Sequence, residues 1–187
     1  MFRYSERLVL AGSILRYKIK DIPSEGEVAD LALPRALLAE SLEGMDADLE
    51  ATSGSARLEL SRTGREVLVQ GELRALVTLP CALCLQPARV PVHVPIRMLF
   101  TDEDAAPDSD DPLDDLDVGH YDGDMLDLAP TLREQLILGV PMSARCRESC
   151  RGLCATCGQD LNLADCGHPP PLGVESPLAA LKNLKLE

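Results

Sequence analysis

Residues 66–80, EVLVQGELRALVTLP, decide the fold class of this chain. Apolar and polar residues alternate through most of the segment, which is typical of a β-strand that buries one face. Residues 57–61, RLELS, alternate in the same way, and Thr63-Gly64 between the two segments favours a tight turn. We therefore predict a hairpin that leads into a long strand. The apolar residues expected on its buried face are Val67, Val69, Leu73, Ala75, Val77 and Leu79.

A second alternating segment follows at residues 89–100, RVPVHVPIRMLF, with apolar residues on one face from Val90 to Met98. Pro91 and Pro95 have no N–H group to donate to a neighbouring strand. This favours an edge strand, or a strand that pairs only on alternate sides. Together with a short helix near residues 33–42, these segments predict an antiparallel β meander or a partly open barrel.

Two covering helices are expected beyond residue 127. Apolar residues recur at helical spacing between 128 and 137, Asp127 is typical of an N-terminal cap, and Gly139 and Pro141 favour termination. A second short helix is predicted at residues 176–187, SPLAALKNLKLE, which begins with serine and proline in cap and first-turn order. Helices that cover an antiparallel sheet give an α+β fold.

The acidic charge of the chain is concentrated in one segment. The net charge is -13, yet residues 101–127 hold twelve Asp or Glu and no Lys or Arg, and the rest of the chain has 19 acidic and 18 basic residues. Such a run is typical of a solvated linker. Alternatively, it docks on a basic partner or covers a basic surface of this protein. The predicted domains are therefore 1–100, mainly β; 101–127, an acidic linker; and 128–187, a helix and a cysteine-rich zinc module that packs on the β domain.

Seven cysteines and one histidine form the most informative pattern. Zinc prefers four thiolate or imidazole ligands, and a two-residue spacing lets one tight turn present two sulfur atoms to the same ion. One group is local, with Gly158 relaxing its turn: Cys154, Cys157, Cys166 and His168. The other group would close a loop of about 60 residues, where a cross-link has a large entropic effect: Cys81, Cys84, Cys146 and Cys150. We predict one or two structural Zn²⁺ ions.

Other interpretations of these cysteines are less favoured. A redox CxxC needs its first cysteine exposed at a helix N-terminus, whereas Cys81 follows Pro80 between two strand patterns. A catalytic zinc usually keeps an open coordination position, whereas four thiolate or imidazole ligands close the site. His93 and His120 are interpreted as surface or packing residues. The sequence has no phosphate-binding loop, nucleophile elbow or convincing triad, and we expect that the protein is not an enzyme.

The composition also bears on location. No stretch of about 18 uncharged apolar residues is present, and Glu6 interrupts the N-terminal segment where a signal peptide needs an apolar run. We expect a cytoplasmic protein without a membrane association. In a reducing cytoplasm, seven closely spaced cysteines favour metal or redox chemistry over disulfides.

The order of these motifs resembles the YceD family. The resembling features are a β meander ending in C-x2-C-L at residues 81–85, an acidic linker, a helix ending in LGVP at 138–141, and C-x3-C-x-G-L-C-x2-C-G at residues 146–158, followed by Leu161-Asn162. The resemblance spans residues 55–187. The family pattern closes with C-x-C, whereas this chain has Cys166-Gly-His168, which keeps a candidate ligand.

The resemblance implies a role in large ribosomal subunit biogenesis, namely 23S rRNA accumulation, without known enzymatic activity. The expected partners are a ribosome assembly intermediate or assembly proteins. A basic cluster near the first cysteine pair is a candidate for rRNA contact, with action through a protein partner as the alternative: Arg133, Arg145, Arg147 and Arg151. A thiol-based redox or zinc-responsive regulatory protein is the alternative function.

Overall fold

The structure is a computed structural model that describes residues 15–102 and 117–168. The described residues form two units. The first, called the sheet unit, contains the residues up to Leu79 together with Arg89–Met142; the second, called the cysteine unit, contains Pro80–Ala88 and the residues from Ser143 onward. The unit boundaries differ from the predicted divisions at 100 and 127, because the turn at Pro80–Ala88 groups with the cysteine-rich segment instead of with the strands that it joins.

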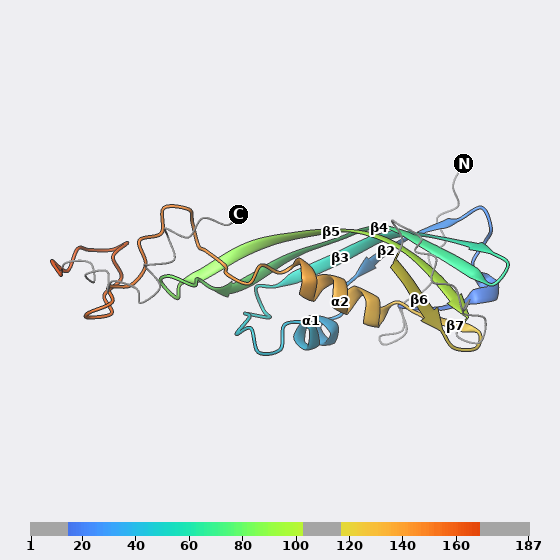
Figure 1. The fold of residues 1–187 in the computed structure, drawn as a ribbon, viewed down its shortest axis with the longest axis horizontal. Helices are drawn as coiled ribbons and strands as arrows, with labels where there is room; N and C mark the ends of the chain where they lie inside the picture. The colour runs from blue at the N-terminus through green and yellow to red at the C-terminus, as the bar shows by residue number, and fades with distance from the viewer. Residues whose placement is uncertain (1–14, 103–116, 169–187) are drawn as a thin grey trace, which may run out of the picture. The chain divides into compact units, whose positions relative to one another are not determined.

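A five-stranded sheet dominates the sheet unit, in the order β2-β3-β4-β5-β6 (Figure 1). Its strands are β2 (Glu27–Ala32), β3 (Ser53–Thr63), β4 (Glu66–Pro80), β5 (Pro87–Asp102) and β6 (Asp117–Tyr121). The predicted hairpin is β3 and β4, which pair antiparallel from Ser53↔Leu76 to Thr63↔Glu66. A small second sheet pairs β1 (Arg16–Lys18) with β7 (Met125–Asp127), and the short 3₁₀ helix η1 (Ile19–Asp21) follows β1.

The sheet is open, so the predicted partly open barrel is wrong. The sheet is also not wholly antiparallel. Strand β6 pairs in parallel with β5, from Met98↔Asp117 to Asp102↔Tyr121. A parallel connection needs a crossover of about a dozen residues or more, and residues 103–116 between the two strands provide that length. The alternating pattern could not reveal this arrangement, because it records which face is buried and not the direction of the neighbouring strand.

The two prolines of β5 lie where the strand has one neighbour among the described strands. Within residues 15–102 and 117–168, strand β6 pairs only with Met98–Asp102, so the half of β5 that contains Pro91 and Pro95 forms the edge of the sheet. Proline is tolerated at an edge because no partner there needs its missing N–H group. The predicted edge strand is therefore confirmed for this half of β5. The other end of β5, Met98–Asp102, lies between β4 and β6 inside the sheet.

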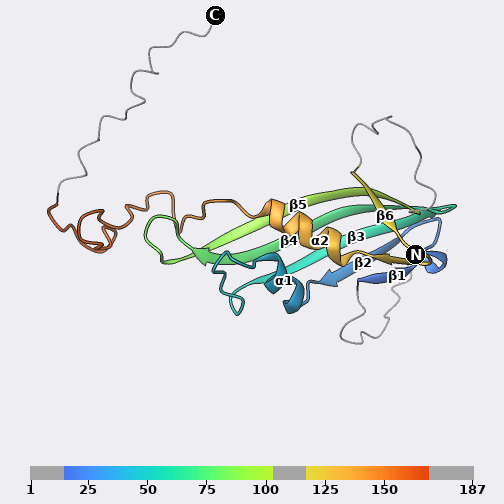
Figure 2. The same cartoon turned by 60° about the horizontal axis from the view of Figure 1, so that its bottom comes forward.

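One face of the sheet is buried under two helices, α1 (Arg35–Ser41) and α2 (Ala129–Gly139), which lie on the same side in two views (Figures 1 and 2). The six apolar residues predicted on the buried face of β4 are all buried. A Cβ atom at Gly139 would lie 2.5 Å from Cγ2 of Val94, so the end of α2 rests directly on β5. The predicted helix at 33–42 corresponds to α1, and the predicted helix at 176–187 lies outside the described residues.

The start of α2 differs slightly from the prediction. The N-cap position is Leu128, and the carboxylate of Asp127 accepts a hydrogen bond from the N–H of Ala129 at 2.9 Å. Asp127 therefore satisfies one free N–H group at the helix start from just outside the cap position. Strands β6 and β7 both lie within the predicted acidic linker, so the end of that segment is part of the fold. Residues 103–116 lie outside the described residues.

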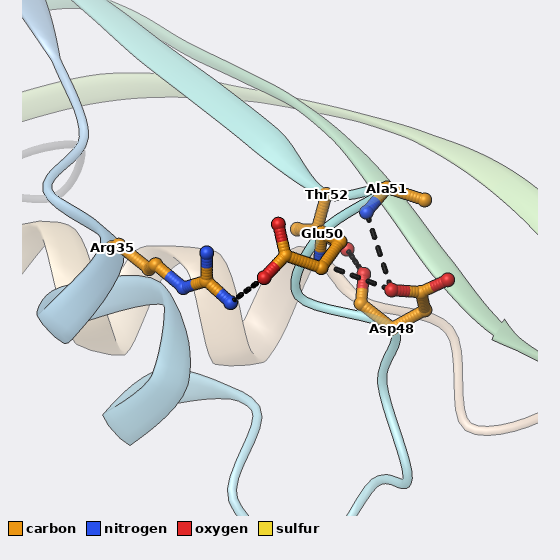
Figure 3. Close-up of polar contacts among 5 residues, drawn as sticks. All are labelled: Arg35, Asp48, Glu50, Ala51 and Thr52. Carbon is orange, nitrogen blue, oxygen red and sulfur yellow. Dashed lines mark hydrogen bonds and ion pairs between the residues drawn. The ribbon is translucent and has the colours of Figure 1, made fainter.

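The loop between α1 and β3 is held by polar contacts (Figure 3). The Asp48 carboxylate accepts hydrogen bonds from the N–H groups of Glu50 at 3.0 Å and Ala51 at 3.3 Å, and the Thr52 hydroxyl donates to the Asp48 carbonyl at 2.7 Å. Glu50 forms an ion pair with Arg35 of α1. Because side-chain acceptors of this kind fix a turn locally, the loop joins α1 to the sheet in a defined way.

The described histidines of the sheet unit make hydrogen bonds with neighbouring strands. Nε2 of His93 lies 2.8 Å from the Glu72 carboxylate, and Nδ1 of His120 lies 3.2 Å from the Thr101 hydroxyl. These contacts agree with the surface or packing roles expected for both. Across residues 15–102 and 117–168, no helix has the length and apolar character needed to cross a membrane.

Gly71 of β4 is predicted to be a position where no side chain fits. Its φ is +153°, and a Cβ atom there would lie 2.1 Å from the Arg57 carbonyl oxygen across the β3–β4 pairing. We expect Gly71→Ala to lower the free energy of unfolding of the sheet unit by at least about 2 kcal/mol. Urea denaturation measures this change. Gly64→Ala is the matched control: its φ is +63° with open space around the site, so only about 1 kcal/mol is expected. Equal losses in the two variants would contradict the steric explanation.

Candidate metal centres

The structure brings the eight predicted ligands together in two groups, both in the cysteine unit. Site A contains Cys81, Cys84, Cys146 and Cys150; site B contains Cys154, Cys157, Cys166 and His168. Within each group the candidate ligand atoms lie within 4.8 Å of one another. The membership of each group is the one that the sequence spacing predicts.

The first two cysteines of each site lie on turns with the same backbone hydrogen bonds. In site A, the N–H of Cys81 donates to the Gln86 carbonyl at 2.8 Å, and the N–H of Leu85 donates to the Cys81 carbonyl at 2.9 Å. In site B, the N–H of Cys154 donates to the carbonyl five residues later and the N–H of Gly158 donates back to the Cys154 carbonyl, both at 2.8 Å. Both sites are therefore built on one type of turn, in which two sulfur atoms face the same point.

The residue after the second cysteine has a positive φ in both turns. In site B this residue is Gly158 with φ 74°, whereas in site A it is Leu85 with φ 62°. A left-handed conformation costs a non-glycine residue about 1–2 kcal/mol. The Leu85 side chain is 66% exposed, so its own burial does not offset this strain. The other interactions of the turn at site A must therefore hold Leu85 in place.

Site A joins two segments that are far apart in the sequence. The N–H of Ala82 donates to the Ala144 carbonyl at 2.8 Å, and the N–H of Leu153 donates to the Leu83 carbonyl at 2.9 Å. A Cβ atom at Gly152 would lie 3.0 Å from the Leu83 carbonyl oxygen, so the second segment approaches the turn closely. These contacts bring residues 143–153 to the turn and place Cys146 and Cys150 beside the first cysteine pair.

The distances between ligand atoms match those of a tetrahedral zinc site. Zinc bonds of about 2.3 Å to sulfur separate two sulfur ligands by about 3.8 Å, and a nitrogen ligand at about 2.1 Å lies about 3.6 Å from each sulfur. In site A the Sγ–Sγ distances are 3.9 Å for Cys81–Cys150 and 3.6 Å for Cys84–Cys146. In site B, Nδ1 of His168 lies 3.9 Å from Sγ of Cys154 and 3.3 Å from Sγ of Cys166. All seven cysteines are free thiols.

The first cysteine of each turn is the one whose thiolate is most favoured. Backbone N–H groups, above all that of Cys146, lower the pKa of Cys81 to about 6. Backbone N–H groups, above all that of Cys157, lower the pKa of Cys154 to about 6 as well. A hydrogen bond donated to sulfur stabilises the charged form, and the thiolate is the form that binds metal. Each turn therefore offers one preorganised thiolate ligand.

Ionisation of the whole of site A is opposed by its own members. At Cys84 the Gln86 N–H group favours the thiolate, but burial and the neighbouring sulfur atoms of Cys150 and Cys146 outweigh it and raise the pKa to about 12. Like charges this close disfavour one another. Four thiolates can therefore coexist here only if a cation lies among them. A Zn²⁺ ion would supply that positive charge.

The structure also reveals a residue whose role the sequence reasoning missed. Nδ2 of Asn162 lies 3.5 Å from Sγ of Cys150, although Asn162 belongs to the loop between the site B ligands Cys157 and Cys166. The only signal in the sequence was its position in the Leu161-Asn162 pair of the family pattern. The family pattern includes Asn162 but does not indicate that its side chain contacts Cys150.

The predicted basic cluster is divided between the two units. Arg133 lies on α2 in the sheet unit, whereas Arg145, Arg147 and Arg151 lie in the cysteine unit. All four side chains are exposed. Arg151 forms an ion pair with Asp165 at 3.5 Å. Three arginines therefore lie close in sequence to Cys146 and Cys150, and one of them already has an acidic partner.

The region that contains sites A and B matches a known protein family. The model of the family "Large ribosomal RNA subunit accumulation protein YceD" matches residues 69–185, which is more than half of the chain. The chain belongs to the YceD family. The match begins within β4 and includes every ligand of sites A and B. The cysteine motifs that carry the resemblance to this family therefore all lie inside the matched region.

Relatives of this chain include bacterial proteins and a plant protein. An uncharacterized protein of Mycobacterium tuberculosis is 33% identical over 111 residues, which cover 59% of this chain and 52% of the relative. A maize protein named "Large ribosomal RNA subunit accumulation protein YCED homolog 1, chloroplastic" is 24% identical over 152 residues, covering 68% of this chain and 52% of the relative. The chain thus spans about half the length of these curated relatives. No solved structure matches it.

Proposed function

We propose that this protein is a zinc-binding, non-catalytic accessory protein of large ribosomal subunit biogenesis that supports 23S rRNA accumulation. The observation that carries the proposal is the pair of four-ligand groups inside the region that matches the YceD family model. The family description and the printed name of the maize relative support the link to ribosomal RNA. Sites A and B supply the physical reason why a scaffold of this kind needs metal.

The ligand sets support structural zinc. Site A offers four thiolates and site B offers three thiolates and one imidazole, so each ion has four protein ligands and no open position for a substrate or water. Zinc in such a site acts as a cross-link that stabilises the fold. The proposed absence of catalysis follows from the closed ligand sets, because the Lewis-acid chemistry of zinc needs an exchangeable position.

The proposed partner is a ribosome assembly intermediate of the large subunit, or an assembly protein bound to it, in the cytoplasm. Arg145 and Arg147 are exposed next to the site A ligand Cys146 and are candidates for contact with rRNA phosphates. A Zn(Cys)₄ site carries a formal charge of about -2, so these arginines also compensate the charge of site A. Only the positive charge that site A does not neutralise is available to bind a nucleic acid.

Two measurements test the proposal. Native mass spectrometry of the purified protein is expected to show two bound zinc ions, and thiol labelling of the same sample is expected to find almost no reactive cysteine. In a strain depleted of the protein, gradient profiles are expected to show fewer large subunits and less 23S rRNA relative to 16S rRNA. Metal-free protein with reactive thiols would overturn the zinc proposal and favour a thiol-based regulatory protein. Unchanged rRNA ratios on depletion would overturn the ribosomal one.

A further inference from the structure

The loop that site B closes also contacts a ligand of site A, and the contact is made by one side chain. Nδ2 of Asn162 donates to Sγ of Cys150 at 3.5 Å, and Oδ1 of the same amide accepts the N–H of Arg151 at 2.9 Å. One end of the amide therefore contacts Cys150, and the other end contacts the next residue, Arg151. A hydrogen bond from each end fixes the position and the orientation of the amide relative to Cys150.

Further contacts attach the segment around Asn162 to the residues that link the two sites. The Asp160 carboxylate accepts from the backbone N–H of Asn162 at 2.8 Å and from its Nδ2 at 2.6 Å. The N–H of Leu161 donates to the Gly152 carbonyl at 2.9 Å, and Asp160 pairs with Leu153 in an isolated β-bridge. Residues 160–162 therefore lie against residues 151–153, which connect the last ligand of site A to the first ligand of site B.

From this geometry we propose that Asn162 is a positioning residue that couples the two metal sites: its amide holds Cys150 as a ligand of site A, from a loop whose conformation site B fixes. The inference rests on the proposed zinc sites. The ligands of site B precede and follow Asn162 in the sequence, so an ion bound there restricts the loop that contains it. The amide can reach Cys150 only while that loop stays in place. Filling site B therefore helps site A to retain its metal.

The chemistry of the amide suits this role. A neutral N–H donor lowers the electron density on a thiolate and relieves part of the excess negative charge of a Zn(Cys)₄ site without competing as a ligand. A carboxylate of the same shape would accept hydrogen bonds only and would place a like charge beside the sulfur. Asn162→Asp therefore reverses the interaction, whereas Asn162→Ala only removes it.

The test follows zinc release from the full-length, zinc-loaded protein into excess chromogenic chelator. Cys84→Ser and Cys157→Ser, each lacking a ligand of one site, assign the release phases to sites A and B. We expect Asn162→Ala to accelerate release from site A by about tenfold, the lower end of the effect of removing a residue that orients a metal ligand. Asn162→Asp is expected to accelerate it further. Release from site B should change by less than about twofold in Asn162→Ala, which also shows that the loop remains folded.

The coupling itself is tested by a double-mutant cycle. In a Cys157→Ser background the loop is no longer fixed, so adding Asn162→Ala should accelerate release from site A by less than about twofold. Gln159→Glu is the control, because it adds a negative charge to the same loop at an exposed side chain; both release rates should stay unchanged.

The outcomes separate this inference from the proposed function. Wild-type protein that binds no zinc refutes both. Wild-type protein with two zinc ions, but with equal effects of Asn162→Ala on the two sites, refutes only the positioning role. A tenfold effect that persists in the Cys157→Ser background supports the contact with Cys150 and refutes the coupling to site B.

Discussion

Cys84→Ser is expected to remove one zinc ion and to release residues 143–153 from the turn at Pro80–Ala88. Cys84 is 3% exposed and lies 3.6 Å from Sγ of Cys146, a partner 62 residues away in the sequence. Site A therefore closes a long loop, and the binding free energy of structural zinc, about 10–16 kcal/mol in small zinc domains, contributes to holding it closed. Loss of one thiolate also leaves the strained conformation of Leu85 supported only by the backbone hydrogen bonds of the turn.

Limited proteolysis followed by mass spectrometry checks this result. Cleavage after Arg145 and Arg147 should become at least tenfold faster in Cys84→Ser, because both arginines lie in the segment that site A ties to the turn. Cys157→Ser is the matched comparison, with free zinc present so that site A stays filled. It also loses one ion, but from the local site B, so protection of Arg145 and Arg147 should change by less than about threefold. If the two variants are cleaved at similar rates, site A is not the site that protects residues 143–153.

Removal of both zinc ions is expected to unfold the cysteine unit and leave the sheet unit folded. In the described part of the cysteine unit, the buried apolar residues are Cys81, Cys84, Ala88, Ala144 and Cys154. Cysteine and alanine side chains bury too little apolar area to offset the conformational entropy of about 35 residues. The sheet unit, by contrast, buries large residues such as Leu58, Leu73 and Leu132 at no more than 1% exposure.

Hydrogen exchange with mass spectrometry measures both units in one experiment. After chelation, amides at residues 80–88 and 143–168 should exchange within seconds, whereas those in β3 and β4 should keep their protection. Adding zinc back should restore the original pattern, which separates metal loss from irreversible oxidation of the thiols. Unchanged protection of residues 143–168 in metal-free protein would show that backbone hydrogen bonds alone can hold the unit.

Local sequence patterns were sufficient for strands β3 and β4, for the presence and the end of α2, and for the membership of sites A and B. Each of these depends on spacing along the chain. Alternation between Val67 and Leu79 reflects one buried face, and a two-residue spacing such as that of Cys154 and Cys157 reflects one turn facing one ion. Such signals need no knowledge of distant residues, so the sequence by itself determined them.

The tertiary structure decided the features that depend on how distant segments meet. The parallel pairing of β6, the open sheet and the position of Pro91 on a half-edge all follow from where the chain returns after residue 102. The positive φ of Leu85 and the hydrogen bond from Asn162 to Cys150 also have no periodic signal. Periodicity records which side of an element is buried, whereas the choice of neighbour, its direction and a single hydrogen bond are fixed only when the whole chain has folded.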